Sequence, residues 1–142
     1  MTYGGDVTPA QCWENLSQSQ NAVLVDVRTQ AEWSFVGVPN LQSGMQPIIG
    51  QSWQIFPTMQ VDEGFVERLV AQLQDRGLDQ SCQMHFLCKT GVRSLAAARA
   101  MYAAGYENTF NILGGFEGDA DENSHRGKIN GWKGDNLPWK QG

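Results

Sequence analysis

The sequence predicts an α/β fold in which an open, mainly parallel sheet of about five strands carries helices on both faces. Three observations predict it. Short apolar runs alternate with helical patterns along the chain, as in folds whose parallel strands are joined by helices. The runs 22–27 and 84–88 are almost continuously apolar, which is typical of strands covered on both faces. Two helical patterns end on a glycine, Gly77 and Gly105, shortly before the next strand.

The length and composition fit one globular domain. The chain has 142 residues, of which 41% are hydrophobic and 18% charged, so a folded core is expected. The net charge of −5 argues against nucleic acid as a partner, because phosphate binding needs a basic face. We expect a single domain over 1–142, with a core over about 8–113 and an extension over 116–142 that packs back on it.

The sequence also indicates a cytoplasmic protein with free thiols. No apolar run approaches the length of a membrane-spanning helix, and the N-terminus lacks the basic and apolar segments of a signal peptide, so no membrane partner is expected. The three cysteines are an odd number without a Cys-x-x-Cys pair, which argues against a disulfide scaffold. A reducing cytoplasm leaves a cysteine free to react.

The first half of the chain is expected to hold two helices and two strands. Thr8 is a typical N-cap and Pro9 a typical first helical residue, so a helix should run from there to about Ser19. The elements that follow are a strand over 22–27, a short helix over 29–35, and a strand over 48–56 that Pro57 ends.

The second half begins with the most regular helical pattern, over 61–76. Its apolar stripe consists of Val61, Phe65, Val66, Leu69, Val70 and Leu73. Gly77 is placed as a left-handed C-cap, with Leu78 folding back onto the last turn. After it we expect a strand into Cys88, a helix over 95–105 and a strand over 109–113. Residues 116–142 are expected to be mostly irregular, anchored by Trp132, Leu137, Pro138 and Trp139.

The segment that starts at Cys88 is the strongest candidate for a reactive site. Cys88 ends a predicted strand, and ligand sites in such sheets lie beyond the carboxyl ends of the strands. A short loop into a helix start turns free N–H groups and partial positive charge toward one point. Lys89 and Arg93 add two cations, and Gly91 allows the backbone to curl closely. Together these features should stabilise a nucleophilic thiolate on Cys88, and Arg93 could hold an anionic substrate by two hydrogen bonds.

Four motifs, in the order and spacing in which the family has them, resemble the rhodanese (thiosulfate sulfurtransferase) family. Along the chain they are Leu24-Val25-Asp26-Val27-Arg28 with Glu32-Trp33, Gly37-Val38-Pro39, Cys88-Lys89-Thr90-Gly91-Val92-Arg93, and Leu113-Gly114-Gly115. The resemblance covers about Thr8 to Leu113, with a weaker match at 132–138. It implies the three-layer rhodanese-like fold and the transfer of a sulfane sulfur from a donor such as thiosulfate to cyanide or a thiol. Cys88 would carry the sulfur as a persulfide, and Lys89, Thr90, Gly91, Val92 and Arg93 would bind the substrate.

The partners that this resemblance implies are a small anionic sulfur donor and a cyanide or thiol acceptor, and a sulfur-relay protein is a further candidate. No cofactor and no metal are expected. The competing class is a non-catalytic rhodanese-like module that binds a partner or senses oxidants through Cys88. Phosphatase or arsenate reductase chemistry is less favoured, because Cys-x4-Arg is one residue shorter than the Cys-x5-Arg loop of phosphatases and surrounds a smaller space.

Other residue patterns have plainer interpretations. Cys12 and Cys82 should be packing residues. Cys82-x-x-His85-x-x-Cys88 has zinc-like spacing, but alternation along a strand would place His85 on the face opposite both cysteines. Asp119-x-Asp121-x-Asn123 begins like a calcium loop, yet Ser124 and Asn130 stand where that loop needs glycine and glutamate.

Further features lie at the same sheet edge, and two of them leave alternatives open. Asp26 and Arg28 should form a structural ion pair or turn bond, which we favour over direct substrate contact. Trp33 is the tryptophan nearest this edge. The family often has a histidine before the Ile-Pro element, but Val36-Gly37-Val38-Pro39 lacks it. The insertion 117–130 begins at the functional edge and could either cover Cys88 or be a surface loop.

Overall fold

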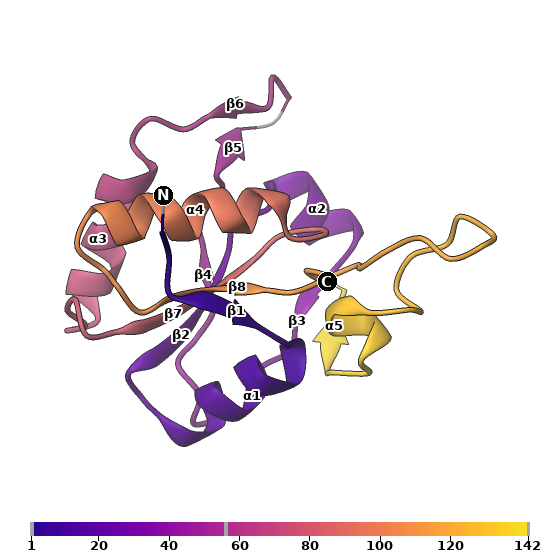
Figure 1. Ribbon diagram of the computed structural model, residues 1–142, viewed down its shortest axis with the longest axis horizontal. Helices are drawn as coiled ribbons and strands as arrows, with labels where there is room; N and C mark the ends of the chain where they lie inside the picture. The colour runs from indigo at the N-terminus through magenta and orange to yellow at the C-terminus, as the bar shows by residue number, and fades with distance from the viewer. Residues whose placement is uncertain (1, 56, 142) are drawn as a thin grey trace.

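The computed structural model describes residues 2–55 and 57–141 and confirms the predicted α/β class. Five parallel strands form one sheet in the order β1-β8-β7-β2-β4 (Figure 1). These strands are β1 (Gly5–Val7), β2 (Ala22–Asp26), β4 (Ile49–Gly50), β7 (Gln83–Leu87) and β8 (Thr109–Ile112). Because β2 and β7 lie inside the sheet and are covered on both faces, all five residues of β2 and four of the five in β7 are buried.

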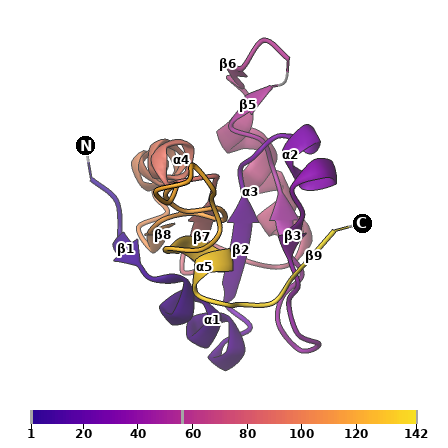
Figure 2. The same ribbon diagram turned by 90° about the vertical axis from the view of Figure 1, so that its right-hand side faces the viewer.

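Helices cover both faces of the sheet, giving three layers (Figure 2). One layer contains α1 (Pro9–Gln18), and the other contains α3 (Phe65–Asp75) and α4 (Val92–Ala103). Two short helices, α2 (Gln30–Phe35) and α5 (Gly131–Gly134), lie beside the sheet. Two small antiparallel pairs complete the fold: β3 (Val38–Pro39) with β9 (Trp139–Lys140), and β5 (Gln54–Ile55) with β6 (Gln60–Val61).

A separate hydrophobic core lies on each face. On the side of α3 and α4, side chains of β2 and β7 pack against apolar residues of both helices. The strands contribute Val23, Val25, Met84 and Phe86, α3 contributes Phe65, Leu69 and Leu73, and α4 contributes Ala97, Ala98 and Met101. On the side of α1, Leu24, Leu87 and Ile112 pack with Cys12, Leu16, Phe116 and Trp132. The alternation of strand side chains between two faces therefore supplies both cores.

The predicted helix caps are confirmed. The Thr8 side chain accepts the N–H of Gln11 while the Gln11 side chain accepts the N–H of Thr8, a capping box at the start of α1. Thr29 and Glu32 form the same arrangement at α2. Gly77 has a φ of 72°, and the Leu78 N–H donates to the Leu73 carbonyl at 2.9 Å, as a Schellman C-cap requires.

The single strand predicted over 48–56 is wrong. Only Ile49 and Gly50 pair with β2, and the chain then turns out of the sheet, where Ser52 donates to the Arg28 carbonyl and the Trp53 N–H to the Val27 carbonyl. Gln54 and Ile55 pair instead with β6 in an antiparallel hairpin. The last residue of the predicted strand, Phe56, lies outside the described residues.

Helix starts also differ from the prediction. α3 begins at Phe65 and not at Val61, which belongs to β6 and is 49% exposed. Asp62 makes the turn between them, because its carboxylate accepts the Gly64 N–H and its carbonyl the Phe65 N–H. α4 begins at Val92, three residues before the predicted start at 95. The sequence pattern also missed β1, whose three residues are held by pairing with β8.

The C-terminal extension is more ordered than expected, since it contains α5 and β9. Trp132, a predicted anchor, is fully buried, and its Nε1 donates to the Pro138 carbonyl at 2.8 Å. Trp139 is 40% exposed, so it is only partly an anchor; its ring lies under the Lys133 ammonium. None of the helices in the described part of the chain is long and apolar enough to cross a membrane.

Candidate active site

Cys88 lies immediately after β7, at the carboxyl edge of the parallel sheet, where the chain turns into α4. Gly91, the N-cap of α4, has a φ of 117°, a value that side-chain-bearing residues rarely adopt. This turn directs the Gly91 N–H to the Cys88 sulfur, with N and Sγ 3.0 Å apart. The Cys88 side chain is nearly enclosed, at 1% exposure. The loop therefore curls around the sulfur, as the residue pattern predicted.

The segment that follows β8 supports this loop from behind. The Phe116 N–H donates to the Cys88 carbonyl at 2.8 Å, and the Glu117 N–H donates to the Lys89 carbonyl at 3.0 Å. A side chain at Gly115 would place its Cβ only 2.5 Å from the Cys88 carbonyl oxygen. Gly115 is thus required by close backbone approach to the Cys88 loop, whereas a Cβ at Gly114 would instead lie 2.9 Å from the Gly131 nitrogen.

Sequence reasoning missed two polar residues of the site: Ser94, which contacts the sulfur, and Asn111, which contacts Ser94. Ser94, in the first turn of α4, is fully buried and its Oγ lies 3.2 Å from Cys88 Sγ. The same oxygen lies 2.5 Å from Oδ1 of Asn111 on β8. An available signal was the polar Asn111 inside an apolar strand, since buried polar groups need partners.

The two cations of the loop have different surroundings. Lys89 is exposed at the rim. Arg93 instead pairs with Glu32 of α2 through two bonds of 2.6 and 2.9 Å. Burial is the largest single influence on Glu32 and raises its pKa, but the hydrogen bonds and charge of Arg93 and the hydrogen bonds of Thr29 together lower the pKa below its ordinary value. Hydrogen bonding to Glu32 likewise raises the pKa of Arg93. Arg93 is therefore already held by a carboxylate, which the sequence pattern did not indicate.

The remaining residues of the predicted loop are more exposed than Cys88. Thr90 and Gly91 are partly exposed, and Val92 is 76% exposed at the start of α4. The loop thus directs the Gly91 N–H to the sulfur, while Lys89 and Val92 are exposed to solvent.

Asp26 and Arg28 form the predicted ion pair, at 2.7 Å, and both side chains are buried. Arg28 also donates to the Gly37 carbonyl at 2.8 Å, and its guanidinium lies over the Phe116 ring at 4.3 Å. The Phe116 N–H in turn donates to the Cys88 carbonyl. Arg28 therefore connects the end of β2 to the segment that holds the Cys88 loop. The predicted ion pair is therefore confirmed.

His85 is a buried core residue, on the face of β7 opposite Cys82 and Cys88. Its Nδ1 lies 3.2 Å from the Val23 carbonyl and its Nε2 lies 3.1 Å from the Asn15 amide. Burial lowers its pKa to about 4, so the ring is neutral near pH 7. Among residues 2–55 and 57–141, no three His, Cys, Asp or Glu side chains are grouped to hold a metal ion.

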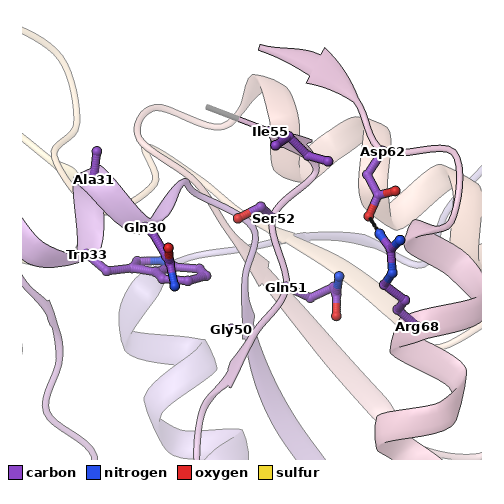
Figure 3. A pocket seen from close by; sticks show the side chains of 9 residues that line it. All are labelled: Gln30, Ala31, Trp33, Gly50, Gln51, Ser52, Ile55, Asp62 and Arg68. Carbon is purple, nitrogen blue, oxygen red and sulfur yellow. Dashed lines mark hydrogen bonds and ion pairs between the residues drawn. The ribbon is translucent and has the colours of Figure 1, made fainter. Parts of the chain in front are cut away.

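A hollow of about 340 Å³ opens at the same sheet edge beside α2 (Figure 3). Trp33 and Gln30 of α2 line one side, and the ion pair of Asp62 and Arg68 lines the other. Gly50 allows the Trp33 ring to lie against the backbone, since a Cβ there would come within 3.1 Å of it. Neither Cys88 nor any residue of the loop over 89–93 lines this hollow.

The insertion 117–130 contacts the Cys88 loop through its base. Both Glu117 and Gly118 donate N–H bonds to the Lys89 carbonyl. Beyond these residues the insertion is held by its own contacts, such as Asp119 with Asn130. It extends away from the sheet (Figure 1). The site is therefore supported by the first residues of the insertion.

Comparison with known proteins gives a consistent result. Residues 8–122 match the model of the rhodanese-like domain. An uncharacterized protein of Rickettsia prowazekii is 33% identical over 95% of this chain and 96% of its own. The thiosulfate sulfurtransferase GlpE of Actinobacillus succinogenes is 26% identical over 80% of this chain and 81% of its own. The crystal structure of Rv0390 from M. tuberculosis has 42% identity and a TM-score of 0.83, covering 99% of this chain and all of that one.

Proposed function

The chain belongs to the rhodanese-like domain family, and on that premise we propose that it is a sulfurtransferase with a persulfide intermediate on Cys88. The donor is a small anionic sulfur compound such as thiosulfate, and the acceptor is cyanide or a thiol. The observation that carries this proposal is the enclosure of Cys88 Sγ by the loop, with the Gly91 N–H at 3.0 Å. The related thiosulfate sulfurtransferase of Actinobacillus succinogenes supports it.

The reaction has two half-steps that regenerate the cysteine. The Cys88 thiolate attacks the outer sulfur of thiosulfate, the S–S bond of the donor breaks, and sulfite leaves with the bonding electron pair. The product is a persulfide anion on Cys88. Cyanide or a thiolate then attacks the outer sulfur, and the sulfur–sulfur bond to Cys88 breaks to return the thiolate. No oxidant or reductant is consumed besides the donor and acceptor themselves.

Backbone groups and charge at the start of α4 favour the anionic forms in this cycle. The helix has 12 residues and begins at Val92, so its partial positive charge adds to the Gly91 N–H donor. We assign donor binding to the backbone of residues 89–93 and to the exposed ammonium of Lys89. Arg93, which Glu32 already binds, contributes to the positive field of the site while paired.

A turnover assay with thiosulfate and cyanide tests the proposal and separates it from a non-catalytic binding or redox-sensing module. We expect turnover in the natural chain and none in Cys88→Ser. Lys89→Ala should raise the KM for thiosulfate, because the ammonium acts on the donor charge. With a neutral sulfur donor the same variant should show little change in kcat. Cys82→Ser, a matched loss of a buried thiol in the same segment, should retain turnover. Full activity of Cys88→Ser would refute the proposal.

A further inference from the structure

The hydrogen bonds behind Cys88 can all be satisfied only when the protons on the sulfur and on Ser94 point in one direction along the chain. A serine hydroxyl has one proton and can accept from two directions, whereas Oδ1 of asparagine only accepts. The 2.5 Å contact between Ser94 Oγ and Asn111 Oδ1 therefore uses the single Ser94 proton. The 3.2 Å contact between Ser94 Oγ and Cys88 Sγ then needs a proton on sulfur. The observed arrangement suits a neutral Cys88 thiol.

A thiolate or a persulfide anion reverses this requirement. Once the thiol proton has left to solvent, the sulfur is only an acceptor, and Sγ and Oδ1 both need the Ser94 proton. Turning the Asn111 amide by half a turn resolves the conflict, because Nδ2 then donates to Ser94 Oγ and the hydroxyl proton is free to face Sγ. In the observed arrangement Nδ2 lies toward Gly91, 3.8 Å from where a Cβ on that residue would be, and the half-turn exchanges the positions of Nδ2 and Oδ1.

We propose that Ser94 and Asn111 are positioning residues that form a two-state hydrogen-bond switch, following the charge on Cys88 through the sulfur-transfer cycle. In the thiol state the donor direction runs from Cys88 to Ser94 to Asn111. In the anionic state it runs from Asn111 to Ser94 to Cys88. The switch moves no heavy atom except those of the amide, so it suits side chains that are 0% and 6% exposed. The persulfide part of this inference rests on the proposed function, but the thiolate part does not.

The charged groups near Cys88 come from β2, α2, the loop itself and the segment after β8. Asp26 with Arg28 and Glu32 with Arg93 form ion pairs. Lys89 on the loop and Glu117 after β8 are the further charged groups beside the loop. Burial raises the pKa of Cys82 to about 11 and raises that of Cys12. These two thiols therefore add little thiolate absorbance at neutral to mildly alkaline pH, and subtracting the Cys88→Ser background isolates the signal of Cys88.

The experiment is a pH titration of thiolate ultraviolet absorbance in the whole protein, with Cys88→Ser as the background. Ser94→Ala should raise the titration midpoint by about one pH unit, the order expected for losing one hydrogen bond to a charged sulfur. Ser94→Thr keeps the hydroxyl and should restore the natural midpoint. Thr109→Val removes another buried hydroxyl from β8 and should leave the midpoint in place.

Asn111→Asp tests the second residue, because a carboxylate can only accept and holds the Ser94 proton away from sulfur. Its upward shift should be larger with Ser94 present than in the Ser94→Ala background, where only the added charge acts. An unchanged midpoint in Ser94→Ala, or an equal shift in Thr109→Val, would overturn the inference. Equal Asn111→Asp shifts in both backgrounds would remove Asn111 from it. No sulfur donor is used, so these results are independent of whether the protein transfers sulfur.

Discussion

Replacing Gly115 by alanine should disable the site by moving the Cys88 loop. A Cβ at this position would lie 2.5 Å from the Cys88 carbonyl oxygen and 2.6 Å from the Lys89 carbonyl carbon. Non-bonded heavy atoms prefer about 3.5 Å, so roughly 1 Å of displacement is needed. Because the atoms in the way are backbone, no side-chain rotation can relieve the contact, and the loop or the 113–118 segment must shift.

The cost to activity follows from that displacement. A misplacement of about 1 Å in an active site can lower the rate about a hundredfold. We therefore expect the turnover of sulfur from thiosulfate to cyanide to fall by about that factor in Gly115→Ala. Stability should fall as well, because alanine at the positive φ of 62° costs about 1–2 kcal/mol before any clash is counted.

Gly77→Ala is the matched control for this prediction. Gly77 has a similar φ of 72°, but no atom lies within 4 Å of where its Cβ would be. It should lose stability through the backbone term alone, by about 1–2 kcal/mol, and keep its turnover. Denaturant unfolding and steady-state kinetics on both variants provide the comparison. If Gly115→Ala matched Gly77→Ala in unfolding free energy and kept full turnover, the close support of the loop by Gly115 would be refuted.

Two further predictions concern pH. Burial lowers the pKa of His85 to about 4, against about 6.5 in the unfolded chain. The unfolded state therefore binds a proton more readily, and the unfolding free energy should fall by about 3 kcal/mol between pH 7 and pH 4. A His85→Gln variant that kept the same pH dependence of urea unfolding would contradict this. Glu32→Gln should destabilise the protein by about 1 kcal/mol at neutral pH. Because pairing with Arg93 lowers the Glu32 pKa, that difference should disappear as the pH falls through the lowered value, and a difference that persisted in strong acid would count against the ion pair.

The parts of the fold that local pattern determines were predictable. Runs 22–27 and 84–88 are apolar because β2 and β7 are covered on both faces, and Gly77 marks a helix end because its conformation is left-handed. The short strands were not, since β1 and β9 consist of three and two residues that depend on distant partners. The same dependence explains why one run after Ile48 divides between two sheets.

The site shows a similar division. Cys88 was identifiable because its position depends on one strand, one loop and one helix that are consecutive in the chain. Ser94 and Asn111 meet only because β7 and β8 pair in a particular register, with Phe86 opposite Asn111. The pairing of Arg93 with Glu32 depends on how α2 packs beside the start of α4. Neither contact can be read from spacing along the sequence.

The central claim is that Cys88 carries a single sulfur atom, and the mass of the intact protein tests it most directly. After incubation with thiosulfate and removal of excess donor, we expect the mass to increase by one sulfur atom, with the added atom mapped to the peptide containing Cys88. Later addition of cyanide should return the original mass. An unchanged mass with every sulfur donor tried, or an added sulfur that maps to Cys12 or Cys82, would contradict the account.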